Sequence, residues 1–519
     1  MNPDLPITPG LDEFLRLAAD RRVISVRTRL LADDLTPIGL YHQLCGQRSG
    51  TFLLESAERG VWSRWSFVGV DCAARLVGNA GRVRWEGRTI AGLPATGRPL
   101  EVLEATLATL HTAVEAELPP FTSGLVGYLG YDLIRELEQL PDTNSADLGL
   151  PDMAMMLVSD LAVLDHHRGE LWLIANAINF DASPEGARPA WLDAVGRIQQ
   201  MVARLTEPRT SLLSVRRPAA PVAPRRQRSR AEYLAMVETA REHIHAGDVF
   251  QVVPSQRFEL DTTADPLDIY RELRIVNPSP YLFLLRMSDS DAGRFALVGS
   301  SPEALVTVKN GMATTRPIAG TAPRGADPEE DRRLETELLA DEKERAEHLM
   351  LVDLGRNDLG RVCVPGSVLV TEFMGVHRYS HVMHLEASIT GRLKPGCSAL
   401  QATMACFPAG TLSGAPKIRA MQLIDDLEVS RRGVYGGVIG YFDFAGNSDT
   451  AIAIRTALIM PDVAHVQAGA GIVADSEPAR EDAEAGNKAA AVLGAVTRAG
   501  NLLRLTASDP GKQTSGMPR

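Results

Sequence analysis

Two pairs of glutamates in the last third of the chain have the type and spacing of ligands for a hard divalent cation. Glu344 and Glu347 are three residues apart in a segment, 341–358, that predicts a helix running into a polar loop. Glu481 and Glu484 repeat that spacing just after a serine and a proline that favour a helix start. Because residues three apart share one helical face, four carboxylates from two helices could form an all-oxygen site suited to Mg²⁺.

Each feature also has a plainer interpretation. A pair of acids on a helix is usually a solvated face, and Glu484 and Lys488 have the spacing of a helix-stabilising ion pair. Arg455 lies in the apolar stretch 451–460, which predicts a strand, and a charge there is costly unless it is paired. Arg455 therefore indicates a ligand or an internal ion pair, whereas Glu303, after a turn, could be a catalytic acid or an ordinary loop carboxylate.

Two histidines are further candidates for proton transfer or ligation. His381 and His384 are three residues apart in a predicted strand. Successive side chains of a strand point to opposite faces, so these two point to opposite sides of the sheet. At most one of them can serve a given pocket.

Composition bounds the class of protein. The 519 residues carry a net charge of −11, which argues against nucleic acid as the main partner. The five cysteines are scattered, without CxxC spacing, which fits a reducing cytoplasm better than a disulfide framework or a zinc site. We expect neither a signal peptide nor a membrane span, because no apolar run approaches ~18 residues.

The pattern of expected helices and strands around these residues predicts an α+β fold. Short apolar runs separated by turn signals alternate irregularly with helical stretches, which indicates layered antiparallel sheets with helices packed outside. We divide the chain into an N-terminal domain, a Pro/Arg-rich linker, a catalytic domain and a disordered tail, at residues 1–205, 206–230, 231–505 and 506–519. The linker lacks interleaved aromatics, so a solvated connector is favoured over a nucleic-acid patch.

Local signals place several helices and loops of the second half. Helices are predicted over 229–246, over 266–275 and from the pair Asp327–Pro328 onward. The glycine-rich pieces 433–440 and 468–471 permit close approach of a ligand to the backbone. Neither has the pattern of a dinucleotide or phosphate loop, so a nucleotide site is not supported.

A set of motifs, in one order, resembles the chorismate-utilising enzymes, and among them the large, aminase subunits of the anthranilate synthases. The resemblance runs from about Phe52 to Arg498. It rests on Leu53-Leu-Glu55-Ser56, Asn277-Pro-Ser-Pro-Tyr281, Pro317-Ile-Ala319-Gly-Thr321, the block 341–358, Phe407-Pro-Ala-Gly-Thr411-Leu-Ser-Gly-Ala-Pro-Lys417 and Gly469-Ala-Gly-Ile. The resemblance implies two interleaved subdomains and a reaction on chorismate.

The resemblance implies addition of ammonia at C2 of chorismate as the C4 hydroxyl leaves, followed by loss of pyruvate. Glu303 stands at the general-acid position, so its carboxyl must be protonated when it acts. Mg²⁺ would bind the ring carboxylate between the two acid pairs. Glu344 and Glu481 are the expected direct ligands, with Glu347 and Glu484 direct or through water.

The resemblance also implies the groups that hold the substrate. The enolpyruvyl carboxylate is expected on a tyrosine, an arginine and backbone N–H groups, the arginine being suited to bidentate binding. Two residues stand near the ring, one of them a histidine that assists pyruvate elimination, and a lysine lies beside the metal. The groups on the enolpyruvyl carboxylate are Tyr435, Arg455 and the backbone of Gly469, Ala470 and Gly471. The residues near the ring are His384, which is the histidine for pyruvate elimination, and Thr411. The lysine beside the metal is Lys488.

Two positions, and the absence of a glutaminase cysteine, discriminate among the relatives. Isochorismate and salicylate synthases have a water-activating lysine where this chain has Gln251, and aminodeoxychorismate synthases have a nucleophilic lysine where it has Ala319. Both absences favour ammonia as nucleophile without a covalent lysine adduct. No cysteine lies in a Gly-x-Cys-x-Gly setting, so we predict a separate glutaminase subunit, in a dimer or a heterotetramer with that partner.

Feedback inhibition by tryptophan is a further property that the resemblance implies. The implied inhibitor site draws on both halves of the chain, and such a site could bias their relative orientation. Some relatives have methionine where this chain has Leu282. The site comprises Glu55, Ser56, Pro280, Leu282, Ile439 and Tyr441.

Two other functions stay open at this level. One is a different chorismate aminase, which would be recognised by 4-amino-4-deoxychorismate as its product. The other is a non-catalytic protein that binds chorismate or tryptophan. The presence of all four acids with Glu303, His384 and Arg455 favours an enzyme over a binding module.

Overall fold

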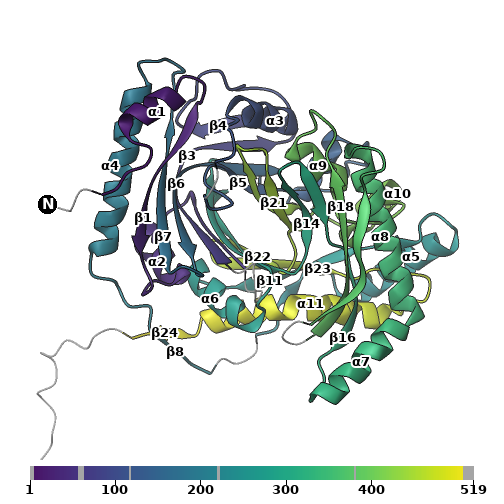
Figure 1. Cartoon of the computed structure of the whole chain (residues 1–519). Helices are drawn as coiled ribbons and strands as arrows, with labels where there is room; N and C mark the ends of the chain where they lie inside the picture. Colours follow the sequence, from purple (N-terminus) through teal and green to yellow (C-terminus); the bar gives the residue numbers. More distant parts are fainter. Residues whose placement is uncertain (1–4, 57–63, 116–117, 219–221, 379–381, 506–519) are drawn as a thin grey trace, which may run out of the picture.

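One large antiparallel sheet dominates the computed structural model, which describes residues 5–56, 64–115, 118–218, 222–378 and 382–505. Among these residues twenty strands join in a single sheet, and every pairing between its strands is antiparallel. Helices lie on the outside of the sheet (Figure 1). The predicted α+β fold, with layered antiparallel strands and outer helices, is confirmed. No helix within the described ranges is both long and apolar enough to span a bilayer.

The first half of the chain supplies the strands and helices at the purple and blue end of Figure 1. They are α1 (Leu11–Leu17), β1 (Val23–Leu31), α2 (Pro37–Cys45), β2 (Thr51–Glu55), β3 (Trp65–Asn79), β4 (Arg82–Gly87), α3 (Pro99–Thr109), β5 (Gly124–Leu129), the 3₁₀ turn η2 (Tyr131–Glu136), β6 (Met153–Asp165), β7 (Glu170–Ile178) and α4 (Ala187–Thr206).

The second half continues the sheet and adds the long helices of the site. Its elements up to the first acid pair are β8 (Ser214–Arg216), β9 (Arg225–Arg226), α5 (Arg230–His245), β10 (Gln251–Val252), β11 (Ser255–Asp261), α6 (Pro266–Val276), β12 (Tyr281–Asp289), β13 (Gly293–Ser301), β14 (Ala304–Lys309), β15 (Met312–Thr315), β16 (Ile318–Pro323), α7 (Pro328–Ala340) and α8 (Glu342–Val362). The remainder are β17 (Leu369–Arg378), β18 (Val382–Arg392), α9 (Ala399–Cys406), the 3₁₀ turn η3 (Gly410–Leu412), β19 (Gly414–Ala415), α10 (Lys417–Leu427), β20 (Val438–Asp443), β21 (Ser448–Ile452), β22 (Thr456–Met460), β23 (Val463–Gly469), α11 (Pro478–Ala499) and β24 (Leu502–Arg504).

Strands from the two halves pair directly with one another. β2 pairs with β12, so that Glu55 lies opposite Leu282, and β5 pairs with β20, so that Tyr128 lies opposite Ile439. Backbone hydrogen bonds therefore run across the division at residue 205. The two halves interleave in one sheet, and the elements that carry the site are fixed relative to the N-terminal strands.

Helix starts follow the local signals closely. Ser229 caps α5 through a capping box with Glu232, and Asp327 caps α7 with Pro328 at its first position. One expectation about a helix end was wrong. The segment predicted to leave the helix for a polar loop before Asp358 is helical to Val362, because Asp358 is buried against Lys417, with Nζ 2.8 Å from its carboxylate, instead of facing water.

The Pro/Arg-rich segment expected to be a solvated linker is fastened to the second half. β8 within it pairs with β24 at the end of the described chain, and β9 pairs with β11. Arg226 Nη2 lies 2.6 Å from the carboxylate of Asp482 on α11. Arg216, Arg226 and Arg230 of this segment thus act as partners for the buried acids Glu272 and Asp482. The tail from residue 506 lies outside the described residues.

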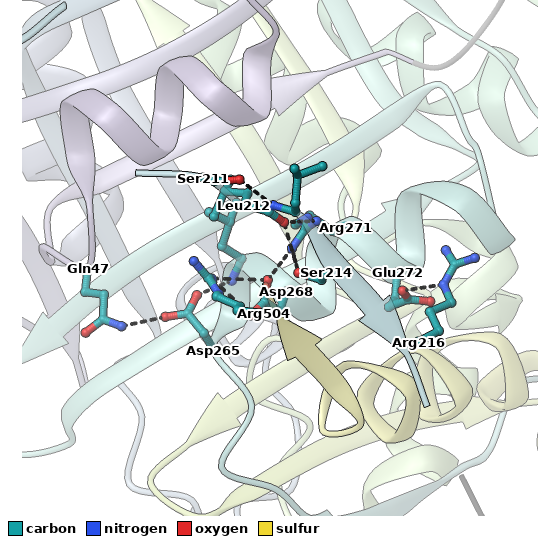
Figure 2. Close-up of polar contacts among 12 residues, drawn as sticks. Gln47, Ser211, Leu212, Ser214, Arg216, Asp265, Asp268, Arg271, Glu272 and Arg504 are labelled. Carbon is teal, nitrogen blue, oxygen red and sulfur yellow. Dashed lines mark hydrogen bonds and ion pairs between the residues drawn. The ribbon is translucent and has the colours of Figure 1, made fainter. Parts of the chain in front are cut away.

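An ion-pair network on α6 ties this segment to the C-terminal strand (Figure 2). The buried carboxylate of Glu272 lies 2.8 Å from Arg216 of β8 and 3.3 Å from Arg498 of α11. Asp268 lies 2.8 Å from Arg271 and 3.2 Å from Arg504 of β24. Three separate segments therefore meet on one helix through charged groups.

We expect Glu272→Ala to lower the free energy of unfolding by about 1–3 kcal/mol. The change removes a buried carboxylate and so leaves Arg216 and Arg498 without their partner on α6. The figure is at the low end for buried pairs because Arg216 and Arg498 are 52% and 38% exposed and solvent screens them. Urea unfolding measures the change. Arg209→Ala is the control, since the exposed Arg209–Asp34 pair is expected to contribute under about 1 kcal/mol. Equal losses in both variants would contradict a role for the network.

Candidate active site

Glu303 lies between β13 and β14, with its carboxyl group facing Thr411 of η3. The Thr411 hydroxyl is 3.3 and 3.2 Å from the two carboxyl oxygens and donates to them. Some of the side chain still meets solvent, but protein surrounds the carboxyl, and this burial raises the pKa of Glu303 to about 8. Glu303 is therefore protonated at neutral pH, which is the state that a general acid needs.

The two predicted acid pairs lie in the first two turns of α8 and α11, and the charge of Glu484 on α11 acts on Glu344 of α8. Burial raises the pKa of Glu344, and the charges of Glu347 and Glu484 raise it further. Burial likewise raises the pKa of Glu481, with Glu484 adding to it. Glu484 belongs to α11 and Glu344 to α8, so the two helices bring all four carboxylates into one electrostatic environment.

The carboxylates have the chemistry of magnesium ligands, but they are not gathered around one point. Beyond the effect of burial, the charges of Glu347 and Glu484 raise the pKa of Glu344, and that of Glu484 raises the pKa of Glu481. These like charges repel one another, and carboxylate oxygens are the ligands that Mg²⁺ prefers. Across the part of the chain that the structure describes, no three Asp, Glu, His or Cys side chains gather as a metal cluster. Glu484 is held instead by Lys488, at 2.7 Å, as the helix spacing allowed.

Arg455 does not lie in the middle of a strand, as the apolar stretch predicted. β21 ends at Ile452 and β22 begins at Thr456, and Arg455 occupies the connection with φ +50°, a conformation uncommon for a residue with a side chain. Its Nη1 donates to the Lys488 carbonyl at 2.9 Å. The break in the strand turns the guanidinium toward α11 and the site.

Tyr435 and the end of β23 complete the wall beside Arg455. Burial raises the pKa of the Tyr435 phenol to about 12, and the nearby Arg455 and a hydrogen bond with the Gly469 backbone counter it. Ala470 is fully buried. A Cβ on Gly471 would lie 2.6 Å from Gln251 Nε2, so a larger residue there would displace the Gln251 amide. These groups, with the Lys488 ammonium 3.2 Å from the Gly469 carbonyl, form a cationic, backbone-lined wall suited to a carboxylate.

His384 lies on β18 opposite Thr321 of β16. Its Nδ1 is 3.0 Å from the Gly320 carbonyl and 3.0 Å from the Thr321 hydroxyl. Burial lowers the pKa of His384, and the charge of Arg455 lowers it further, so the ring is neutral at pH 7. The other histidine considered, His381, lies outside the described residues.

Gln251, which the resemblance singled out only as the position of a lysine in isochorismate and salicylate synthases, contacts a member of the first acid pair. Its side chain is buried, and Nε2 lies 3.3 Å from a Glu347 oxygen. The residues contributed by β10 are too few to show a strand period, so the sequence pattern gave no sign of this contact. The Gln251 amide therefore lies between Glu347 of α8 and the glycine-rich segment that follows β23.

The predicted inhibitor residues divide between two faces of the sheet. Glu55 and Leu282 are cross-strand partners, and the Glu55 carboxylate pairs with Tyr270 and with Arg274 of α6. Leu282 packs in the same core as Tyr270. The face near α6 therefore holds two of the six residues.

The other face holds Ile439 and Tyr441, which pack in a different core. Tyr281 reaches that face, because its hydroxyl donates to Asp449, the cross-strand partner of Tyr441, at 3.0 Å. Ser56 has a buried hydroxyl without a hydrogen-bond partner among the described atoms, and Pro280 directly precedes β12. Leu282 and Ile439 therefore belong to different cores, and Tyr281, next to Leu282, lies on the side of Ile439 and Tyr441.

Comparisons with known proteins agree with this geometry. The pattern of a protein family described as chorismate binding enzyme matches residues 50–494. The chain is 55% identical over 497 residues to anthranilate synthase component 1 of Mycolicibacterium smegmatis, covering 95% of each chain. The crystal structure of anthranilate synthase component I from Streptococcus pneumoniae superposes with a TM-score of 0.73 at 38% identity, covering 89% of this chain and 98% of that one. The menaquinone-specific isochorismate synthase of Escherichia coli, at 19% identity, shares the fold alone, with a TM-score of 0.68 over 94% of this chain and 98% of that one.

Proposed function

The chain belongs to the family of chorismate-binding enzymes, and we propose that it converts chorismate and ammonia to anthranilate and pyruvate, as the aminase component of an anthranilate synthase. The observation that carries the proposal is the buried Glu303 carboxyl, protonated at neutral pH and held by Thr411. It is a proton donor placed in a cationic site, which suits the loss of a hydroxyl from an anionic ring.

In the first step, the amination of chorismate, different residues hold the substrate and donate the proton. The cationic wall of Arg455, Tyr435 and the backbone at the end of β23 would hold the enolpyruvyl carboxylate. Ammonia attacks C2, and the two ring double bonds shift from C1=C2 and C5=C6 to C1=C6 and C4=C5. The C4–O bond breaks as Glu303 gives its proton to the departing hydroxyl, which leaves as water, and the new ammonium group can return a proton to the Glu303 carboxylate. Thr411 donates to the Glu303 carboxyl and so fixes its orientation.

The second step makes the ring aromatic. His384 takes the proton from C2 of the aminated intermediate, the C–H electrons form the last ring double bond, and the C3–O bond breaks. The enolpyruvate leaves with that electron pair and gains a proton to become pyruvate. A neutral histidine is the form that can accept the C2 proton.

The acids of α8 and α11 are the residues that would hold Mg²⁺. Glu344 and Glu481, with Glu347 and Glu484, supply only oxygen donors. Burial and the charges of neighbouring carboxylates raise the pKa values of Glu344 and Glu481, which a bound cation would counter. When bound, Mg²⁺ supplies a Lewis acid for the ring carboxylate. We propose it as the cofactor on this donor chemistry.

Ammonia is proposed to come from a separate subunit that hydrolyses glutamine. Cys45, Cys363 and Cys406 are buried, and burial raises the pKa of each thiol, the opposite of what an amidotransferase nucleophile requires. The relatives from Mycolicibacterium smegmatis and Streptococcus pneumoniae are called component 1 and component I of anthranilate synthase, a name that implies a second component. The proposal includes a cytoplasmic site of action, which fits five unpaired cysteines.

Incubation of the purified chain with chorismate, ammonium and Mg²⁺ tests the proposed function, with anthranilate fluorescence as the signal. Ammonium should support the reaction and glutamine alone should not. Formation of 4-amino-4-deoxychorismate would identify a different aminase, and a folded chain with no turnover would move the protein to the class that only binds its ligand. Anthranilate from glutamine without a partner would contradict the separate glutaminase subunit.

Tryptophan is proposed as a feedback inhibitor that binds between the halves, near Ser56 and β20. We expect Ser56→Phe to raise the tryptophan concentration for half inhibition at least about tenfold, which corresponds to about 1.4 kcal/mol, because a phenyl ring would fill the space beside the buried hydroxyl. Assays with ammonium measure inhibition apart from any partner.

Leu282→Met is the matched control for that prediction, since Leu282 packs in the core near α6 and the change nearly conserves volume. It should leave inhibition within a few-fold of the unmodified chain. Retained sensitivity in Ser56→Phe would remove Ser56 from the inhibitor site.

A further inference from the structure

The strand β16 contains a bulge at Gly320, next to the histidine of the proposed second step. The register of β16 against β18 shifts between Ala319 and Thr321, so Gly320 is left without a cross-strand partner. Gly320 has φ +69°. A Cβ there would lie 3.1 Å from the side chain of Leu385 and 3.3 Å from that of Leu338, so the position disfavours any other residue through both its backbone and its neighbours.

The bulge has a specific result for the backbone carbonyl. A bulge leaves the extra residue unpaired and can re-aim its groups. Here the Gly320 carbonyl lies 3.0 Å from Nδ1 of His384. A carbonyl oxygen can only accept a hydrogen bond, so this contact requires the proton of the neutral ring to be on Nδ1. Nε2 then carries the lone pair.

The Thr321 hydroxyl is compatible with the same tautomer. Its oxygen lies 3.0 Å from His384 Nδ1 and can accept a share of the same N–H. Thr321 and His384 are direct cross-strand partners, so the register that makes the bulge also sets this contact. Two acceptors on neighbouring residues of one strand therefore face one ring nitrogen.

We propose that Gly320 is a positioning residue: its bulge turns a main-chain carbonyl onto Nδ1 of His384 and so fixes the tautomer whose Nε2 can take the C2 proton. The inference rests on the proposed function for the identity of the proton, but not for the tautomer itself. A histidine with the opposite tautomer would present N–H to the substrate and could not act as the base.

The direct test is the ¹⁵N chemical shifts of the His384 ring in the unmodified chain, assigned as the signals lost in His384→Asn. We expect Nδ1 to be protonated and Nε2 to be unprotonated at pH 7.5. This measurement needs neither chorismate nor turnover. A ring with its proton on Nε2 would overturn the proposal, whatever the outcome of the activity assay.

Gly320→Ala supplies the kinetic test. We expect the elimination step to slow by about 10- to 100-fold, as for other groups that orient a functional histidine, while the amination step changes little. The aminated intermediate should then accumulate and be seen by chromatography. The ring ¹⁵N signals should show a mixture of tautomers.

Gly311→Ala is the matched control for backbone strain. Gly311 also has a left-handed conformation, φ +73°, and a Cβ there would meet open space. If Gly320→Ala and Gly311→Ala gave the same kinetics and tautomers, Gly320 would be structural only and the proposal would be wrong. If Gly320→Ala failed to fold, Thr321→Val would take its place. We then expect the elimination rate to fall in Thr321→Val and to recover in Thr321→Ser, which keeps the hydroxyl. Equal losses of rate in both variants would contradict the contact with His384.

Discussion

Glu303→Gln is expected to slow chorismate consumption by about 10²- to 10⁴-fold, the usual contribution of a general acid. The amide is nearly isosteric with the carboxyl and can still accept from Thr411, so binding should persist while proton donation is lost. Initial rates and KM with ammonium as nitrogen source separate the two. A wild-type rate in this variant would remove Glu303 from the reaction.

The pH dependence of the unmodified chain should show the same group. The pKa of Glu303 is raised to about 8, so the carboxyl is protonated below that pH and loses its proton as the pH rises through it. The reaction needs the protonated carboxyl, so kcat should fall above about pH 8. This fall is the alkaline limb of the pH–rate profile. In Glu303→Gln that limb should be absent from the residual activity.

Two neighbours should move the alkaline limb in opposite directions. The charge of Glu386 raises the pKa of Glu303 and the hydrogen bond from Thr411 lowers it. Glu386→Gln is therefore expected to shift the limb to lower pH and Thr411→Val to higher pH. Shifts of the same sign would show that another group titrates in this range.

Much of the fold was accessible from the sequence because its signals are local. A serine with a glutamate three residues on, or an aspartate before a proline, fixes a helix start through contacts within one turn, as at Ser229 and Asp327. The alternation of short apolar runs similarly predicted antiparallel strands. The order of those strands, and the pairing of β2 with β12, depends on contacts more than 200 residues apart and leaves no local trace.

The site shows the same division between local and distant causes. Four glutamates could be picked out by helical spacing, but the effect of the Glu484 charge on Glu344 depends on how the sheet places α8 and α11. Arg455 was selected because a charge in an apolar run is costly, yet the run is broken at that residue by a left-handed backbone that no periodicity indicated. Gln251 and the Gly320 carbonyl act through contacts made by tertiary structure, so residue type alone could not reveal them.

The two acid pairs carry the second large prediction, in which removal of one carboxylate has opposite effects with and without metal. The pKa of Glu344 is raised by burial and by neighbouring carboxylates, so its charge at neutral pH opposes folding of the metal-free chain. Glu344→Gln should therefore raise the melting temperature without Mg²⁺. Glu481, whose pKa is raised by burial and by Glu484, should behave in the same way.

With Mg²⁺ the sign should reverse. A ligand that binds only the folded state stabilises it by about 2.7 kcal/mol at a concentration one hundred times its Kd, so Mg²⁺ should raise the melting temperature of the unmodified chain. Glu344→Gln and Glu481→Gln should each lose that increase, and with it at least about 10²-fold in Mg²⁺-dependent turnover, since several kcal/mol of charge stabilisation go with the metal. Glu342→Gln is the control, because Glu342 is an exposed residue of the same helix turn. Full Mg²⁺ stabilisation and turnover in both site variants would mean that the facing acids are solvated helix ends, and that the shortage of positive charge between α8 and α11 is met by Lys343 and Lys488 alone.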